Sequence, residues 1–218
     1  SDISREFDIP QNRFRIVPNG INTDIFHPVS GIEREQGRII VTNSADTPLK
    51  GLFYLLKALA EISKTRKVRL IVVGTPKKNG AVVKLIKTLG IGHLVTFTGR
   101  IGDGEFVRQY ARAAMAVVPS VYEGFGLPAG EAMACGVPVI STTGGALPEV
   151  VGDAGILVPP ADHLLLAEAV KALLDSPERA DKFGRAGYKR VQDNFTWKKA
   201  AEKTVEAYRE VICDYRGV

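Results

Sequence analysis

Residues 123–136 read Glu-Gly-Phe-Gly-Leu-Pro-Ala-Gly-Glu-Ala-Met-Ala-Cys-Gly, and this stretch indicates both a fold and a kind of site. A hydrophobic run, Met115 to Pro119, precedes it, and Pro128 suits the first position of a short helix. The glycines before that helix leave backbone N–H groups without partners, and the helix macrodipole favours negative charge there. The pattern therefore predicts a phosphate-binding turn, with Glu123 and Glu131 placed to contact hydroxyl-rich groups.

Apolar β-branched runs alternate with amphipathic stretches along the chain, which is typical of βαβ units around a parallel sheet. The runs are continuously apolar, as expected when helices cover both sheet faces. We therefore expect an α/β fold, a Rossmann-like three-layer parallel sheet with extra C-terminal helices. The predicted strands are 38–42, 68–73, 94–98, 115–119, 137–141 and 155–158; the main predicted helices are 52–63, 81–89, 105–112, 163–175 (capped by Asp162), one capped by Ser176, and 196–214.

Glycine-rich or polar segments follow five of the predicted strands. Ligands of doubly wound sheets bind beyond the carboxyl ends of the strands, so these segments are expected to form one site. Glycines that only make turns would explain each segment alone, but they explain the whole set poorly. The segments are 43–51, 74–78, 99–103, 120–126 and 142–149.

The composition is that of a soluble globular protein, with 218 residues, 45% of them apolar, and a net charge of +5. No apolar run approaches the roughly 18–20 residues of a membrane span. Cys135 and Cys213 have neither metal-ligand nor disulfide spacing, which favours reduced thiols in the cytoplasm. The basic residues are scattered without a nucleic-acid motif, so we expect no nucleic-acid partner. They indicate solvated surface, or a weak attraction to anionic lipid at the inner face of the membrane.

With these segments in place, the chain resembles the donor-binding half of a GT-B glycosyltransferase. More narrowly, it is similar to the retaining nucleotide-sugar glycosyltransferases of family 4. The resemblance covers nearly the whole chain, and the Glu-x7-Glu block is its most specific part. It is carried by Ile16–Asn22, Leu49–Gly51, Val72–Gly74, Phe97–Arg100, Pro119–Val139, Gly144-Gly145, Pro148-Glu149 and Gly155–Val158.

The resemblance implies a role for each residue of the site. Glu123 would contact hydroxyls of the donor sugar beside the anomeric centre, and Glu131 would accept hydrogen bonds from the ribose hydroxyls. A carboxylate suits both tasks because it offers about four lone-pair sites. Lys50 would pair with the departing diphosphate. The other implied donor-binding residues are Gly124, Phe125, Gly126 and Leu127 around the helix start, with the amides of the last two on the distal phosphate, Arg100 and Ile101 around the base, and Gly74 and Ser44 in neighbouring loops.

Several of these residues also have a purely structural interpretation. Glu131 could be a surface acid favoured by the helix dipole, and Lys50 a solvated lysine. Arg100 could cap a helix or form an ion pair. Phe125 is expected to pack under the turn rather than to touch substrate. None of the three histidines lies in the loops of the site, so none is a good general base.

The implied reaction develops negative charge on a departing diphosphate and oxocarbenium character on the sugar. Fixed N–H dipoles and a lysine meet that charge without reorganisation, so we expect neither a metal nor another cofactor. The resemblance also implies retention of the anomeric configuration. One departure concerns the diphosphate: the family places an arginine five or six residues before the lysine, where this chain has Ala45 and Ser44. Hydroxyl and backbone donors of residues 42–48 either replace that bidentate contact, or the diphosphate binds more weakly.

A second departure is that a GT-B enzyme needs two Rossmann-like domains. We expect residues 1–18 to be the end of an acceptor domain, 19–195 to be the donor-binding domain, and 196–218 to be a helix that packs back toward the missing N-terminal acceptor domain. The chain alone should bind a nucleotide sugar yet be nearly inactive; a membrane-associated or lipid-linked acceptor would fit. The last helix carries a stripe that we expect to be a packing face: Trp197, Ala201, Val205 and Tyr208.

Three alternatives stay open to different degrees. The chain could be a donor-binding subunit that works with a separate acceptor subunit. It could be an epimerase or phosphorylase on the GT-B scaffold, although no segment indicates a lysine for pyridoxal phosphate. A Rossmann oxidoreductase is disfavoured, because the first strand ends in Asn43-Ser44 rather than in Gly-x-Gly-x-x-Gly. The base, the sugar and the acceptor are not specified by these motifs.

Overall fold

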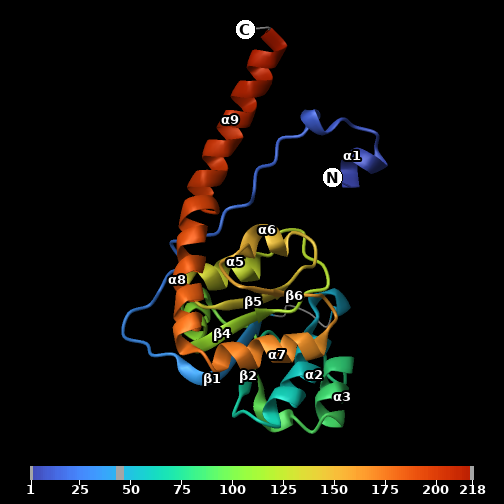
Figure 1. The fold of residues 1–218 in the computed structure, drawn as a ribbon, viewed down its shortest axis with the longest axis vertical. Coiled ribbons are helices and arrows are strands. Elements are labelled where there is room, and N and C mark those ends of the chain that lie inside the picture. Colours follow the sequence, from blue (N-terminus) through green and yellow to red (C-terminus); the bar gives the residue numbers. More distant parts are fainter. Residues whose placement is uncertain (1, 43–46, 217–218) are drawn as a thin grey trace.

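The computed structural model describes residues 2–42 and 47–216, and its centre is a six-stranded parallel sheet (Figure 1). The strand order is β3-β2-β1-β4-β5-β6. This order reverses between β1 and β4, which is the point where doubly wound sheets bind their ligands. The strands are β1 (Glu35–Thr42), β2 (Arg69–Val73), β3 (Val95–Phe97), β4 (Ala113–Val118), β5 (Val139–Thr142) and β6 (Ile156–Val158).

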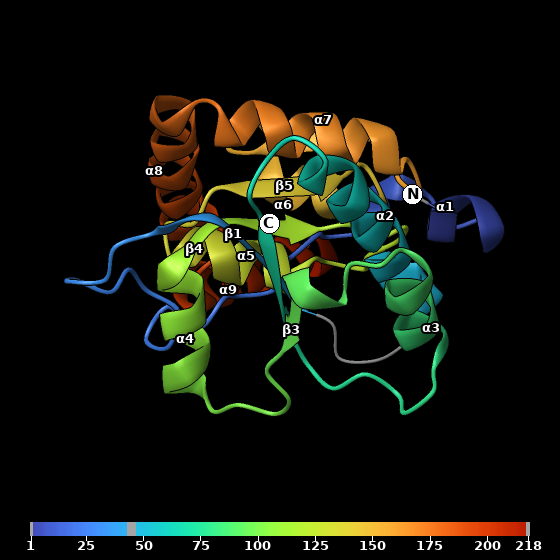
Figure 2. The same ribbon diagram turned by 90° about the horizontal axis from the view of Figure 1, so that it is seen from below.

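Helices cover both faces of the sheet, so the predicted three-layer α/β class is confirmed. Figure 2 shows α7 along one side of the sheet and α4 along the other. The helices on the first side are α2 (Leu52–Ser63), α3 (Ala81–Thr88) and α7 (His163–Leu174); those on the second are α4 (Asp103–Arg112), α5 (Leu127–Ala134) and α6 (Leu147–Val151), with α8 (Pro177–Asn194) packed on α5.

Strand β1 shows why the strands read as continuous apolar runs. Ile39 and Val41 are buried beneath α2 and α7, whereas Ile40 between them is buried on the side of α4 and α5. Successive side chains of a strand point to opposite faces, so a strand covered on both faces must be apolar throughout. Because β1 has a neighbouring strand on each side, its last residue, Thr42, lies near the middle of the carboxyl edge of the sheet.

The predicted elements agree with the structure except at particular points. Helix α6 lies in a segment expected to be a loop; Pro148 in its first turn was the available signal. Asp162 caps α7 as predicted, because its side chain accepts from the N–H groups of Leu164 and Leu165. Ser176 does not cap α8, since its side chain accepts no hydrogen bond from the first turn.

The last helix, α9 (Trp197–Arg216), leaves the body of the molecule, and the N-terminal segment with α1 (Asp2–Glu6) and a 3-10 turn (Gln11–Arg13) extends at the same end (Figure 1). Arg15 Nε lies 2.5 Å from Glu210 Oε2 between them. The predicted packing stripe of α9 stays a prediction: Trp197 is 59% and Tyr208 is 67% exposed, because the helix runs beyond the layers of this chain, and its expected partner is the acceptor domain. The domain bounds at residues 18 and 195 stay a prediction.

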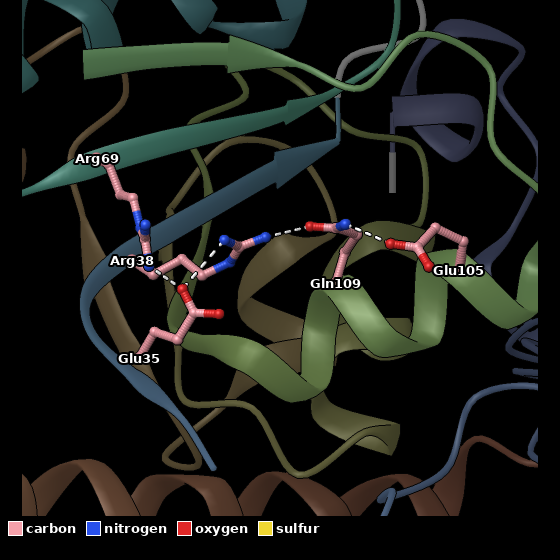
Figure 3. A network of polar contacts seen from close by, with 5 residues as sticks. All are labelled: Glu35, Arg38, Arg69, Glu105 and Gln109. Carbon is pink, nitrogen blue, oxygen red and sulfur yellow. Dashed lines mark hydrogen bonds and ion pairs between the residues drawn. The ribbon is translucent and has the colours of Figure 1, made fainter. Parts of the chain in front are cut away.

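A polar network ties together the amino ends of the central strands, at the edge opposite the predicted site (Figure 3). The buried guanidinium of Arg38 donates to Glu35 Oε2 over 3.2 Å and to Gln109 Oε1. Glu35 also accepts from Arg69, and Gln109 donates to Glu105 Oε1 over 2.5 Å. Arg38 Nε has no partner among the described residues, and burial lowers the pKa of Arg38. The network joins β1 to β2 and α4.

Candidate functional site

Lys50 and Glu123 meet at the point where the strand order reverses. Lys50 ends the 3-10 turn Pro48–Lys50 after β1, and Glu123 follows β4. Lys50 Nζ lies 2.6 Å from Glu123 Oε1. The lysine side chain is 34% exposed and the glutamate side chain only 10%. A nearly buried carboxylate is therefore neutralised by an ammonium group that solvent, or an anion at the surface, can still reach.

The loops that carry these two residues are joined through their backbones. The N–H of Val121 donates to the carbonyl of Leu49 over 2.8 Å. Gly51 has φ +69°, and a Cβ there would lie 1.8 Å from the carbonyl oxygen of Pro119, so only glycine allows this approach. The ion pair thus rests on main-chain contacts between the ends of β1 and β4.

The loop after β5 supports Glu123 from the other side. The N–H of Ala146 donates to the carbonyl of Glu123 over 2.9 Å. Gly144 packs against the carbonyl of Val121, where a Cβ would lie 2.3 Å from the oxygen. The backbone on both sides of the Glu123 side chain is therefore held by segments from a neighbouring strand.

Two hydroxyl residues of this support were missed in the sequence interpretation. Ser120 Oγ donates to Glu123 Oε1 over 3.0 Å, and Ser120 is only 2% exposed. Thr142 Oγ1 donates to the carbonyl of Ser120, and accepts from the N–H of Gly144 over 3.2 Å. The available signal was that each hydroxyl lies at the carboxyl end of a buried strand, where polar side chains serve a site more often than a core.

The predicted phosphate-binding turn lies at the start of α5. Gly126 has φ +100° and provides no side-chain cap, and Pro128 lies in the first turn. The carbonyl of Gly126 accepts from Ala129 and Gly130, but the N–H groups of Gly126 and Leu127 donate to no described residue. Two amides at a helix start are thus available to an anion.

The neighbours of that turn differ in exposure. Phe125 packs under the turn as expected: its ring meets Phe195 edge-on, with centroids 6.0 Å apart. Gly124 is exposed, and Gly126 is buried. The ring of Phe125 faces the core, and its contact with a ligand stays a prediction.

Glu131, on α5, is half-buried, which argues against a plain surface acid. Burial and, to a smaller extent, the negative charge of Asp103 raise the pKa of Glu131 to about 7. Asp103, at the start of α4, was not among the predicted site residues. Near neutral pH Glu131 therefore exchanges between a form that only accepts hydrogen bonds and a form that can also donate one.

The remaining predicted residues are distributed along the same edge. Gly99 N–H donates to the carbonyl of Gly74 over 3.1 Å, which joins the loops after β2 and β3. Ile101 packs against the core, whereas Arg100 is exposed and forms no ion pair with a described residue. Ser44 lies outside the described residues. The structure thus brings Lys50 and Glu123 into contact and leaves the role of Arg100 a prediction.

Two of the cavities away from this edge have a structural explanation. These two, of about 270 and 380 Å³, flank Arg34 at the amino ends of the strands. Arg34 donates to the carbonyls of Ala113 and Gly136 over 2.8 and 2.7 Å, which ties β4 to the turn before β5. A structural role accounts for this arginine. We therefore place the candidate site at the carboxyl edge of the sheet. The ion pair and the free amides there are the reason for this choice, not the size of a cavity.

The described part of the chain has neither a cluster of metal-ligating side chains nor a helix suited to a membrane. No group of three His, Cys, Asp or Glu side chains within residues 2–42 and 47–216 is placed to hold a metal ion. Among the helices of the same residues, none combines the length and apolarity that crossing a bilayer requires. Independence from metal and cytoplasmic location stay predictions.

The fold has clear relatives among solved structures. It superposes on sucrose-phosphate synthase from Thermosynechococcus elongatus with a TM-score of 0.83 and 32% identity, over 98% of this chain and 56% of that one. HepE from Anabaena in complex with UDP-glucose shares the fold, with a TM-score of 0.76 and 21% identity over 90% of this chain and 57% of that one. These likenesses confirm the predicted half of a GT-B fold.

The sequence comparison leads to a family. The chain is 41% identical, over 215 residues, to an MMP alpha-(1->4)-mannosyltransferase of Mycolicibacterium hassiacum, which covers 97% of this chain and 52% of the relative. The chain thus spans about half the length of the curated relatives it matches. The family model described as glycosyl transferases group 1 matches residues 24–190, most of the chain. The chain therefore belongs to the glycosyl transferases group 1 family.

Proposed function

We propose that this chain binds a nucleoside-diphosphate sugar at the carboxyl edge of its sheet and forms the donor half of a glycosyltransferase. The reaction is transfer of the sugar to a hydroxyl acceptor, with retention of the anomeric configuration and without a metal ion. The observation that carries the proposal is the 2.6 Å ion pair of Lys50 with Glu123, next to the free amides at the start of α5.

The charges at this edge suit a diphosphate that departs from a sugar. The ammonium of Lys50 and the amides of Gly126 and Leu127 are donors set at the end of fixed elements. Donors that are already oriented stabilise developing negative charge without a reorganisation cost. Glu123, held close to the lysine, accepts from sugar hydroxyls at the end of the ligand that carries the reacting carbon.

Glu131 suits the ribose end of the same ligand. Its carboxylate has no described hydrogen-bond partner and accepts from two vicinal hydroxyls when ionised. The raised pKa means that ribose binding shifts Glu131 toward its charged form, because hydroxyl donors favour the carboxylate. UDP-glucose in the fold neighbour HepE is a ligand of this class.

The acceptor site belongs to a part that this chain does not contain. The relatives are about twice as long, and the exposed faces of α9 lie beyond the body that binds the donor. The chain alone is therefore expected to bind the donor and to turn over poorly. The acceptor, including a membrane-associated one, is a property of the whole protein.

Calorimetric titration of the chain with UDP, GDP and ADP tests the proposal. We expect saturable binding of one diphosphate, weakened by roughly tenfold or more in Glu131→Ala, since a hydrogen bond to a charged group contributes about 1.5–3 kcal/mol. Glu168→Ala, an exposed acid on α7, is the matched control and should bind as the wild type does.

Two results would be incompatible with a donor site that includes Glu131. If no nucleoside diphosphate binds to this chain or to a longer natural protein that contains it, the donor site is wrong. Equal losses of affinity in Glu131→Ala and Glu168→Ala would show that the nucleotide does not bind at α5.

A further inference from the structure

One oxygen of Glu123 has two donors of different character. Lys50 Nζ lies 2.6 Å and Ser120 Oγ 3.0 Å from the same atom, Oε1. Lys50 is a long, partly exposed side chain, whereas Ser120 is 2% exposed and lies at the end of β4. Glu123 Oε2 has no hydrogen-bond partner among the described residues. One oxygen is anchored, and the other is left available.

Ser120 is itself held by the adjacent strand. Its carbonyl accepts from Thr142 Oγ1, and the N–H of Gly144 donates to that hydroxyl oxygen over 3.2 Å. The hydroxyl that holds Glu123 thus rests on the frame of β4 and β5. Lys50 instead reaches the carboxylate through a flexible four-carbon stem, so its ammonium group is free to move to a more strongly charged anion.

We propose that Ser120 is a positioning residue that keeps the carboxylate of Glu123 oriented while Lys50 moves from Glu123 to the diphosphate. This inference rests on the proposed function. A diphosphate competes with Glu123 for the ammonium, so donor binding weakens the hydrogen bond from Lys50 to Oε1. Ser120 keeps its hydrogen bond to Oε1, and Oε2 continues to face the sugar hydroxyls. Without Ser120 the carboxylate either follows Lys50 or rotates, and its contact with the sugar weakens.

A purely structural role for Ser120 makes a different prediction. If the hydroxyl only satisfied a buried acceptor, its removal would loosen the loop and lower the affinity for every ligand to the same extent. A positioning role instead weakens the contact with the sugar and spares the contact with the diphosphate. The affinity ratio between a nucleotide sugar and its parent diphosphate separates the two roles.

The experiment titrates the chain with the preferred nucleoside diphosphate and with its glucose and mannose derivatives. In Ser120→Ala we expect the affinity for the diphosphate to stay within about twofold of wild type, while the ratio of sugar nucleotide to diphosphate affinity falls about fivefold, because the hydrogen bonds between Glu123 and the sugar are weakened rather than lost. Ser141→Ala is the matched control. Its buried hydroxyl donates to the carbonyl of Val118 over 3.1 Å and does not touch Glu123.

A double-mutant cycle adds a second readout. In a Glu123→Gln background, Ser120→Ala should change the affinity ratio by less than about twofold, because the group that it positions is gone. An equal loss for both ligands in Ser120→Ala, or the same effect in both backgrounds, overturns the inference and leaves the proposed function intact. Failure of the wild-type chain to bind either ligand overturns both.

Discussion

Gly145 lies so close to Glu123 that a Cβ on the glycine would stand 2.2 Å from the glutamate's carbonyl oxygen. The loop after β5 and the loop after β4 are therefore in direct main-chain contact beside the candidate site. The position of Glu123 depends on a residue that has no side chain at all.

Gly145→Ala should displace the loop that carries Glu123. Gly145 has φ +63°, so a side chain adds backbone strain of about 1–2 kcal/mol to the clash, and we expect a loss of unfolding free energy above roughly 3 kcal/mol. Gly90→Ala is the control, because Gly90 has φ +68° and open space around it. Urea unfolding measures both; similar losses would show that the contact with Glu123 matters little.

Lys50→Met should leave Glu123 as a nearly buried charge without its partner. We expect a loss of roughly 1–3 kcal/mol in unfolding free energy, and a smaller loss when Glu123→Gln is added. The exposed pair of Lys64 with Glu61 is the comparison, where the same cycle should give a much weaker coupling because solvent screens both charges. Additive effects of Lys50→Met and Glu123→Gln would contradict the interaction.

Glu131 should make stability depend on pH in the mildly acidic range. A carboxyl whose pKa is higher in the folded than in the unfolded chain contributes most at low pH, and this contribution is lost as pH rises from 4.5 toward about 7. Glu131→Gln removes the loss. One pKa unit corresponds to about 1.4 kcal/mol. The unfolding free energy of Glu131→Gln, relative to that of the wild type, should therefore increase by roughly 1–3 kcal/mol between pH 5 and 8.

Thermal or urea unfolding across that pH range measures the difference. Glu168→Gln, an exposed acid on α7, serves as control and should follow the wild-type curve. A constant offset between Glu131→Gln and wild type would show that Glu131 ionises normally.

Asp162 and Ser176 form a natural pair for testing helix caps. Asp162→Ala removes the acceptor of two N–H groups at the start of α7 and should cost about 1 kcal/mol. Ser176→Ala removes a hydroxyl that caps nothing at the start of α8 and should change stability by less than about 0.5 kcal/mol. Chemical denaturation measures the unfolding free energy of both variants. A larger loss in Ser176→Ala than in Asp162→Ala would contradict the prediction.

Arg38 offers a test of the network at the opposite edge (Figure 3). Arg38→Met removes a buried guanidinium whose Nε has no described partner, while Glu35 keeps Arg69 and Gln109 keeps Glu105. We expect a change within about 1 kcal/mol, because well-packed apolar residues often replace buried charges without loss. A loss beyond about 3 kcal/mol in urea unfolding would show that the guanidinium is essential.

Local patterns were sufficient for most elements and for the glycine turn before α5. The β-branched runs, Pro128 and the glycines act on residues a few positions away, so their effect can be read from the chain. The stripe on α9 shows a limit of the same reasoning, because spacing at helical period reveals an apolar face and not what covers it. That reasoning also missed α6, where the residues expected to form a loop contain a short helix.

The sequence by itself determined the alternation of strands and helices, the glycine turn before α5 and the two carboxylates around it. Only the tertiary structure decided that Lys50, 73 positions before Glu123, contacts it, and that Ser120 and Thr142 support that contact. The physical reason is that propensity and capping act within a few residues. The meeting of distant loops instead follows from strand order, which parallel crossovers set across the whole sheet.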